Sequence, residues 1–373
     1  MNNDKLKQSF QWLVGLAGIT VNGTHPYDIQ VKNDELYGRV LSDTALGLGE
    51  SYMDQWWECK AIDTFIDRIL RADLLSKVKQ DSATAWQLFK ARALNLQTPH
   101  RSFLVGRKHY DIGNDLYLAM LDKRMQYTCG YWEAADNLES AQKAKLELIC
   151  RKIGLRPGMK ILELGCGFGG FARYAARKYD AHVTGFTVSK EQATFAAKLC
   201  SGLPVDIRYD DYRNASGEYD RVVSIGMMEH VGHKNYRAYM ELTHRLLKDD
   251  GIAFVHTIGG NTSRKICNNW TLKYIFPNSS LPSIAQLGKA MEGLFVVEDW
   301  HNFGQDYDKT LMAWYKNFKQ AWPGLKHNYS ERFYRMWEYY LLSCAGGFRS
   351  RSMQVWQMVM TKSGRTRPDC RIT

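Results

Sequence analysis

The chain has 373 residues, 45% of them hydrophobic and 13% aromatic, and its formal net charge at pH 7 is +11. This length allows two domains and a sizeable core, and the apolar content excludes an intrinsically disordered chain. No run approaches the roughly 18 apolar residues of a membrane-spanning helix, and the first residues lack the long apolar centre of a signal peptide. We therefore expect a folded, cytoplasmic protein.

The basic charge and the cysteines restrict the partners only loosely. A positive surface favours nucleic acid or anionic lipid, and it equally fits an ordinary basic surface. No block of Lys and Arg resembles an RNA-binding tail, because acidic residues are interspersed. The eight cysteines include no CxxC pair, so we expect no metal site and, in a cytosolic chain, free thiols.

The first part of the chain is expected to form a small N-terminal domain over residues 1–85. Its last predicted helix covers residues 62–75. The adjacent Trp56 and Trp57 allow two interpretations, a core position or an anchor in the lipid interface, and the core is the more common one. A helical linker is predicted over residues 86–105.

From residue 106 to residue 373, aliphatic runs alternate with helical patterns. The predicted strands are 160–164, 182–186, 205–209, 219–225 and 251–257, and the predicted helices are 116–121, 171–178, 190–200, 235–247, 281–289 and 329–348. This alternation is typical of an α/β domain with a doubly wound, mainly parallel sheet, as in Rossmann-like folds.

The most informative segment of this domain is the run Lys-Ile-Leu-Glu-Leu-Gly-Cys-Gly-Phe-Gly-Gly at 160–170. A strand carrying Glu163 is followed by a turn through Gly165, Gly167 and Gly169, and then by a helix. Glycines at this spacing permit a tight turn and the close approach of a ligand to a helix N-terminus. Because the turn sits inside a βαβ unit, it indicates a nucleotide-type site more strongly than a structural turn.

The strand after this loop narrows the choice of ligand. A dinucleotide-binding unit would carry an acidic residue at the end of that strand. Here the groups at this point are Thr187, Ser189 and Gln192, although Glu191 is near, and no Gly-Lys-Ser phosphate loop is present. A nucleoside without a pyrophosphate, such as S-adenosylmethionine, fits this pattern.

Other segments carry a second, more specific pattern. They are Gly-Leu-Gly-Glu-Ser-Tyr-Met-Asp at 47–54, Lys-His-Tyr-Asp-Ile-Gly-Asn-Asp at 108–115, Met-Gln-Tyr-Thr-Cys-Gly-Tyr-Trp at 125–132, Gly-Met-Met-Glu-His-Val-Gly at 226–232, His-Thr-Ile-Gly at 256–259, Trp-His-Asn-Phe-Gly at 300–304 and Leu-Met-Ala-Trp-Tyr at 311–315. Together with the Gly-rich loop and Thr-Val-Ser-Lys-Glu-Gln at 187–192, they resemble the cyclopropane-fatty-acyl-phospholipid synthases. These are bacterial S-adenosylmethionine-dependent methyltransferases that act on unsaturated acyl chains. The resemblance covers nearly the whole chain.

This resemblance implies a site for S-adenosylmethionine and a bound bicarbonate ion. The implied bicarbonate ligands are Cys129, Glu229, His256, the backbone of Ile258, and Tyr307. The implied S-adenosylmethionine-binding residues are Tyr127, Thr128, Glu163, Gly165, Cys166, Gly167, Gly169, Thr187, Ser189, Gln192, Asp211 and Tyr212. Cys344 matches a cysteine considered for catalysis in the family, although a buried helical thiol is the simpler interpretation.

The chain departs from the family pattern at four positions. Thr128, Gly130, Phe168 and Met228 stand where close relatives often have Ser, Ala, Trp and Phe. These changes keep the chemistry of each motif, but they could reshape the acyl pocket.

The resemblance further implies an N-terminal domain that engages lipid, a phospholipid substrate, and a homodimer at the inner face of the membrane, without nucleic acid. The expected reaction adds a methylene group to a cis double bond and gives a cyclopropane acyl chain. Three alternatives remain open at this point. One is a methyltransferase with a polar acceptor such as RNA, one is a family variant that adds only a methyl group or water, and one is a lipid-binding protein with a vestigial fold.

Overall fold

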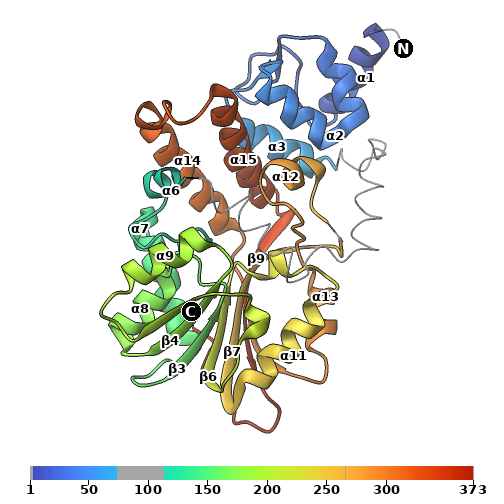
Figure 1. Ribbon diagram of the computed structural model, residues 1–373. Coiled ribbons are helices and arrows are strands. Elements are labelled where there is room, and N and C mark those ends of the chain that lie inside the picture. The colour runs from blue at the N-terminus through green and yellow to red at the C-terminus, as the bar shows by residue number, and fades with distance from the viewer. Residues whose placement is uncertain (1–2, 74–112, 265, 373) are drawn as a thin grey trace. The chain divides into compact units, whose positions relative to one another are not determined.

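The computed structural model describes residues 3–73, 113–264 and 266–372 (Figure 1). The described residues fall into two compact units. The first takes its residues from Met1–Leu94, Ile266–Pro277 and Tyr307–Met353, and the second from Asn95–Lys265, Asn278–Asp306 and Gln354–Thr373. The predicted linker at 86–105, and most of the motif at 108–115, lie outside the described residues.

The first unit is mainly helical. Its elements are α1 (Asn3–Gly15), α2 (Glu35–Met53), α3 (Ile62–Arg71), α12 (Asn269–Tyr274), α14 (Gln305–Leu325, from Tyr307 onward) and α15 (Glu331–Arg349), with a short antiparallel ribbon of β1 (Gln30–Val31) and β2 (Trp57–Glu58). A Cβ on Gly346 of α15 would lie 2.4 Å from the carbonyl oxygen of Asp63 in α3. The glycine therefore permits these two helices, far apart in the sequence, to pack closely. This division differs from the prediction of one continuous domain over residues 106–373, because packing between distant segments leaves no local sequence signal.

Trp57 belongs to the core of this unit. Its side chain is fully buried, its ring lies 5.0 Å from that of Tyr52 and 5.4 Å from that of Phe65, and its Nε1–H donates to the carbonyl oxygen of Leu48. The core interpretation of Trp57 is therefore confirmed, and the anchor interpretation is wrong for this residue because no face of the ring is free for lipid. Trp56 stays partly exposed, with the Arg39 guanidinium 4.8 Å from its ring.

The second unit is built on a seven-stranded sheet with the order β5-β4-β3-β6-β7-β9-β8. The strands are β3 (Lys160–Leu164), β4 (His182–Thr187), β5 (Val205–Tyr209), β6 (Tyr219–Ile225), β7 (Leu247–Gly260), β8 (Val296–Asn302) and β9 (Met353–Thr361). β3 pairs in parallel with β4 and β6, β4 with β5, and β6 with β7, while β8 and β9 are antiparallel. The predicted Rossmann-like α/β class with a mainly parallel sheet is confirmed.

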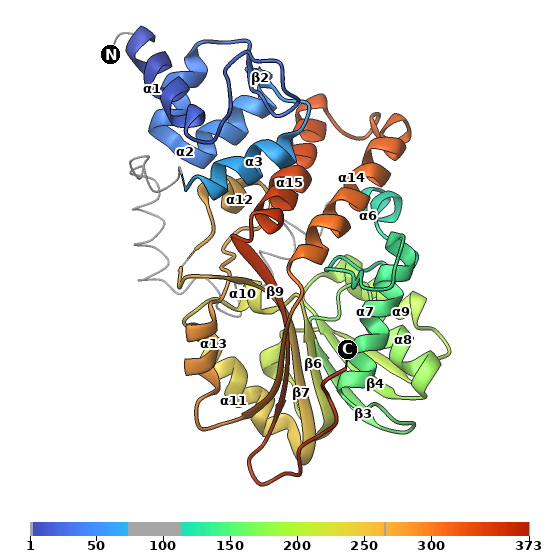
Figure 2. The same cartoon turned by 180° about the vertical axis from the view of Figure 1, so that it is seen from behind.

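Helices cover both faces of this sheet (Figures 1 and 2). They are α7 (Leu138–Lys152), α8 (Gly170–Tyr179), α9 (Lys190–Leu199), α10 (Met228–Val231), α11 (Tyr236–Leu246) and α13 (Ile284–Met291). The unit also contains α6 (Asn114–Met120). Successive strand residues point to opposite faces. Leu162 and Val222 therefore join the core beneath α10, α11 and α13, while Ile161 and Val223 join the core beneath α7 and α8. Within the described ranges, no helix has the length and apolar character that spanning a bilayer demands.

Candidate active site

The Gly-rich loop joins β3 to α8 at the carboxyl end of the parallel strands. Gly165, Gly167 and Gly169 all have positive φ angles, of 82°, 53° and 77°. A Cβ on Gly165 would lie 2.9 Å from the sulfur of Met227, whereas one on Gly167 would meet nothing within 4 Å. Gly165 is thus required by packing and Gly167 by its conformation, and the open space beside Gly167 is where a ligand can approach the backbone.

The end of β4 presents the predicted polar groups in an ordered arrangement. Ser189 caps α9 by accepting the backbone N–H of Gln192, and the Thr187 hydroxyl is 3.1 Å from Oε1 of Gln192. All three side chains are buried. At the end of the next strand, the Asp211 carboxylate accepts the backbone N–H of Arg213 and pairs with its guanidinium, and Tyr212 is buried beside it. These hydroxyl, amide and carboxylate groups are of the types that bind ribose and adenine. Their contacts with S-adenosylmethionine stay predictions.

A buried lysine that the sequence analysis did not single out lies behind the segment with Tyr127 and Thr128. Lys145 of α7 is completely buried, and its ammonium donates to Oγ1 of Thr128 at 2.9 Å and to Oε1 of Gln126. Neither acceptor is charged. Burial lowers the pKa of Lys145 to about 8. The available signal was a lysine at an inward position of α7, between the buried Ala141 and Ile149.

Glu163 is the ionisable neighbour of this lysine. Burial raises the pKa of the Glu163 carboxyl to about 8, while the Lys145 ammonium and the Ala172 N–H act in the opposite sense. Among the described residues, Oε2 of Glu163 has no hydrogen-bond partner. A buried carboxyl oxygen without a partner at the end of β3 fits the ammonium group of a bound amino acid moiety, as in S-adenosylmethionine.

Glu229 and Ile258 form the next part of the site. Glu229 lies in α10, after β6, and its Oε1 accepts the backbone N–H of Ile258 at 2.6 Å. Its Oε2 has no hydrogen-bond partner within the described ranges, and burial raises the pKa of the carboxyl to about 7. The Ile258 N–H was expected to donate to bicarbonate. In the structure this N–H donates to Glu229, and its role toward bicarbonate stays a prediction.

His256 lies in β7, two residues before Ile258. Its side chain is buried, and burial holds the pKa of the imidazole well below its usual value, so the ring is neutral. Its Nδ1 is 3.4 Å from Nε2 of Gln357 in β9. With the Gln357 amide in this orientation, its nitrogen donates to Nδ1, and the ring proton of His256 is then on Nε2. Gln357 is a second residue that sequence reasoning missed.

Cys129 is the third predicted bicarbonate-binding side chain in this unit, after Glu229 and His256. It is fully buried, and its Sγ–H donates to the carbonyl oxygen of Gly130 at 3.2 Å. The preceding residue, Thr128, lies against β6, since a Cβ on Gly226 would be 2.8 Å from its methyl group, and the Gly226 N–H donates to the carbonyl oxygen of His256. The structure therefore brings the Cys129 segment to the strand ends that carry Glu229 and His256. A protonated carboxyl, a neutral imidazole and a thiol are donors that fit an anion such as bicarbonate.

Tyr307 and Cys344 belong to the first unit. Tyr307 is buried in α14, with its ring 4.5 Å from that of Phe348. Cys344 lies in α15, and burial raises the pKa of its thiol to about 12. Little thiolate is present at neutral pH, which argues against a nucleophilic role. The predicted catalytic roles of both residues stay predictions.

Comparison with known proteins shows the family of this chain. The profile of the family described as mycolic acid cyclopropane synthetase matches residues 97–358 of the chain. The chain belongs to this family. It is 51% identical, over 350 residues, to the cyclopropane-fatty-acyl-phospholipid synthase of Escherichia coli (strain K12). The aligned region covers 94% of this chain and 92% of that protein. The chain is therefore an S-adenosylmethionine-dependent methyltransferase, and the vestigial lipid-binding alternative falls away.

Two solved structures of this family match the fold. The cyclopropane synthase MmaA2 from Mycobacterium tuberculosis gives a TM-score of 0.67 at 30% identity, over 71% of this chain and 99% of that one. The mycolic acid cyclopropane synthase CmaA1, in complex with S-adenosylhomocysteine (SAH) and CTAB, gives 0.66 at 32% identity, over 70% and 98%. These likenesses support S-adenosylmethionine as the cosubstrate of this chain.

Proposed function

We propose that this enzyme converts cis double bonds in the acyl chains of phospholipids into cyclopropane rings. The observation that carries the proposal is the buried polar group of Glu229, His256 and Cys129 at the strand ends, beside the Gly-rich loop. A methyltransferase for a polar acceptor needs no such water-excluded donors. The identity to a cyclopropane-fatty-acyl-phospholipid synthase supports the same substrate class.

The reaction makes clear demands on the protein. The π electrons of the alkene attack the sulfonium methyl, a C–C bond forms, and the S–CH3 bond breaks with its electrons going to sulfur. The other alkene carbon is then a carbocation, which water would capture as an alcohol. Loss of a proton from the added methyl group lets its C–H electrons close the ring. The site must therefore exclude water and hold a base, and the complete burial of Cys129 and near-complete burial of His256 provide the first condition.

Bicarbonate, when bound, would supply that base. In our proposal, Glu229 shares a proton through Oε2 while the Ile258 N–H fixes Oε1, and His256 donates from Nε2. Cys129 would donate by rotating its S–H away from the Gly130 carbonyl. Tyr307 is the remaining proposed donor. The protein's part is to hold and orient an anion with neutral donors, which avoids placing a cation beside the carbocation.

The substrate also requires contact with a membrane. We propose that the enzyme associates peripherally with the bilayer, that residues 1–85 help to engage lipid, and that it acts as a homodimer. The net charge of +11 supports attraction to anionic headgroups.

The decisive experiment is mass spectrometry of phospholipids with monounsaturated chains after incubation with the protein and S-adenosylmethionine. We expect a gain of one CH2 and loss of the olefin. Glu229→Gln should reduce this turnover by about 100-fold or more, since an amide cannot hold the shared proton. The matched control is Glu218→Gln, at an exposed position outside the site, which should leave turnover unchanged. No mass change in the wild-type reaction, with SAH still bound, would overturn the proposed substrate.

A further inference from the structure

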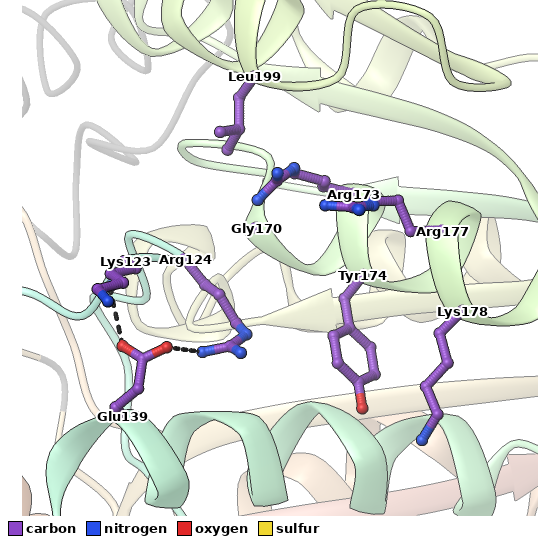
Figure 3. Close-up of a pocket in the computed structure, with 9 residues that line it drawn as sticks. All are labelled: Lys123, Arg124, Glu139, Gly170, Arg173, Tyr174, Arg177, Lys178 and Leu199. Carbon is purple, nitrogen blue, oxygen red and sulfur yellow. Dashed lines mark hydrogen bonds and ion pairs between the residues drawn. The ribbon is translucent and has the colours of Figure 1, made fainter.

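A basic groove lies on the second unit, outside the residues assigned to the reaction. Figure 3 shows the side chains that line it. The groove has a volume of about 460 Å³. Its lining residues are Lys123, Arg124, Glu139, Gly170, Arg173, Tyr174, Arg177, Lys178 and Leu199. Five of these nine carry a positive charge and one carries a negative charge. This volume falls within the range of sites that hold small molecules.

Only part of this positive charge is neutralised by the protein. Arg124 pairs with Glu139, and the Lys178 ammonium lies 2.5 Å from a carboxylate oxygen of Glu147. Glu139 also accepts the backbone N–H of Lys123 at 3.2 Å (Figure 3). Among the described residues, however, no carboxylate forms an ion pair with the side chain of Lys123, Arg173 or Arg177. The groove therefore presents three cationic side chains that form no ion pair within the described residues.

The three cations come from two segments that the fold brings together. Arg173 and Arg177 are four residues apart on α8 and so lie on the same side of the helix. Lys123 lies in the loop before α7. The loop is held against the start of α8, because a Cβ on Gly170 would lie 2.2 Å from the carbonyl oxygen of Arg124. Lys123 and Arg177 are exposed and Arg173 is partly exposed, so the charges line an open rim.

This arrangement favours several anionic groups at a surface over one small enclosed ion. Cations that are spread along an open rim can each contact a different anionic headgroup of a membrane surface. The adjoining loop continues directly into Gln126 and Thr128, which contact Lys145 at the cosubstrate segment. Binding at the rim would therefore hold the bilayer beside the loop that leads to the active site.

We propose that this groove, formed by Lys123, Arg173 and Arg177, binds the anionic headgroups of a phospholipid bilayer. The inference rests on the proposed action on phospholipids and names the surface that meets them. It makes membrane binding a property of the catalytic unit itself.

The test compares two triple variants of the full chain. In the first, Lys123→Gln, Arg173→Gln and Arg177→Gln remove the unpaired cations and leave both ion pairs of the groove intact. In the second, Arg156→Gln, Arg245→Gln and Lys289→Gln remove the same charge from exposed positions elsewhere on this unit. Cosedimentation is measured with vesicles of phosphatidylglycerol and of phosphatidylcholine, without S-adenosylmethionine, and SAH affinity reports on folding.

We expect the wild type to prefer phosphatidylglycerol. The groove variant should lose about 100-fold in affinity for these vesicles at low salt, and the control variant less than about threefold. Equal weakening of both variants would overturn the proposal in favour of diffuse charge. Displacement by inorganic phosphate, beyond that by chloride at equal ionic strength, would assign the groove to a small anion instead. Because turnover is not measured, failure here is distinct from failure of the proposed reaction.

Discussion

Glu229 belongs to the candidate active site, and its buried carboxyl lowers the stability of the folded protein at high pH. Its carboxyl is buried, and only one oxygen is satisfied among the described residues. Burial raises its pKa to about 7, whereas an unfolded glutamate releases its proton near the ordinary value of 4.5. The folded state therefore binds a proton that the unfolded state has lost between these two pH values. The contribution of the neutral carboxyl to the free energy of unfolding is fully present below pH 4.5 and is lost as the pH rises through about 7.

The Glu229→Gln variant tests this linkage. Glutamine cannot ionise and keeps an oxygen for the Ile258 N–H. We expect the variant to exceed the wild type in free energy of unfolding by about 3 kcal/mol at pH 8, with the difference vanishing near pH 4.5. Denaturant unfolding at both pH values measures this, with Glu218→Gln as the control. A constant difference at all pH values would show that Glu229 titrates normally.

Lys145 is a buried cation whose direct contacts are neutral oxygens of Gln126 and Thr128. We expect Lys145→Met to weaken SAH binding by about tenfold, because both acceptors lose their donor and Glu163 loses its nearest positive charge. Folding should change less, since methionine avoids the cost of burying an ammonium. Isothermal titration with SAH and denaturant unfolding separate the two effects. Unchanged SAH affinity in a folded variant would make Lys145 purely structural.

At the scale of elements, the tryptophans of β2 and α1 lie in opposite environments. Trp57 of β2 is buried, whereas Trp12 of α1 is 62% exposed, with Leu16 one turn later also exposed. Phe10 and Val14 face the core from the same helix. The exposed aromatic face of α1 is therefore the better candidate for contact with a lipid interface.

Paired substitutions distinguish these roles. Trp57→Ala should destabilise the protein by about 3–5 kcal/mol through the cavity it leaves. Trp12→Ala should change stability by less than about 0.5 kcal/mol, while weakening binding to phosphatidylglycerol vesicles several-fold. Thermal unfolding and vesicle cosedimentation measure the two effects. Unaltered vesicle binding by Trp12→Ala would remove α1 from the membrane-binding surface.

Other elements show why some predictions were accurate and others incomplete. β3, β5 and β6 match the predicted strands residue for residue. β3 and β6 are largely buried and rich in aliphatic residues, which gives a clear local signal, whereas β5 is a mostly exposed edge strand. Among the described residues after 113, six α-helices and β-strands were not predicted: α7, α10, α12, α14, β8 and β9. α7 buries Lys145 and Lys152, and its polar inward positions weaken the helical hydrophobic pattern. β8 mixes charged residues with apolar ones and gains its place only by pairing with β9.

At the scale of the whole molecule, each unit is assembled from separated segments of the chain. α12, α14 and α15 complete the first unit, although the sequence analysis grouped them with the catalytic domain. The strand order of the second unit places the Gly-rich loop, the end of β4 and the end of β6 along one edge of the sheet. That edge is where ligands bind in open α/β folds.

The sequence by itself determined the fold class, the loop after β3 and the family, because glycine spacing and aliphatic runs are local patterns. Only the tertiary structure decided which groups share a buried space. It placed the Ile258 N–H on Glu229, set Gln357 beside His256, and buried Lys145 behind Thr128. It also joined Lys123 to Arg173 and Arg177 in one groove. Each of these arrangements depends on contacts between residues that are far apart in the chain. The resulting burial and charge environment cannot be read from a local sequence pattern.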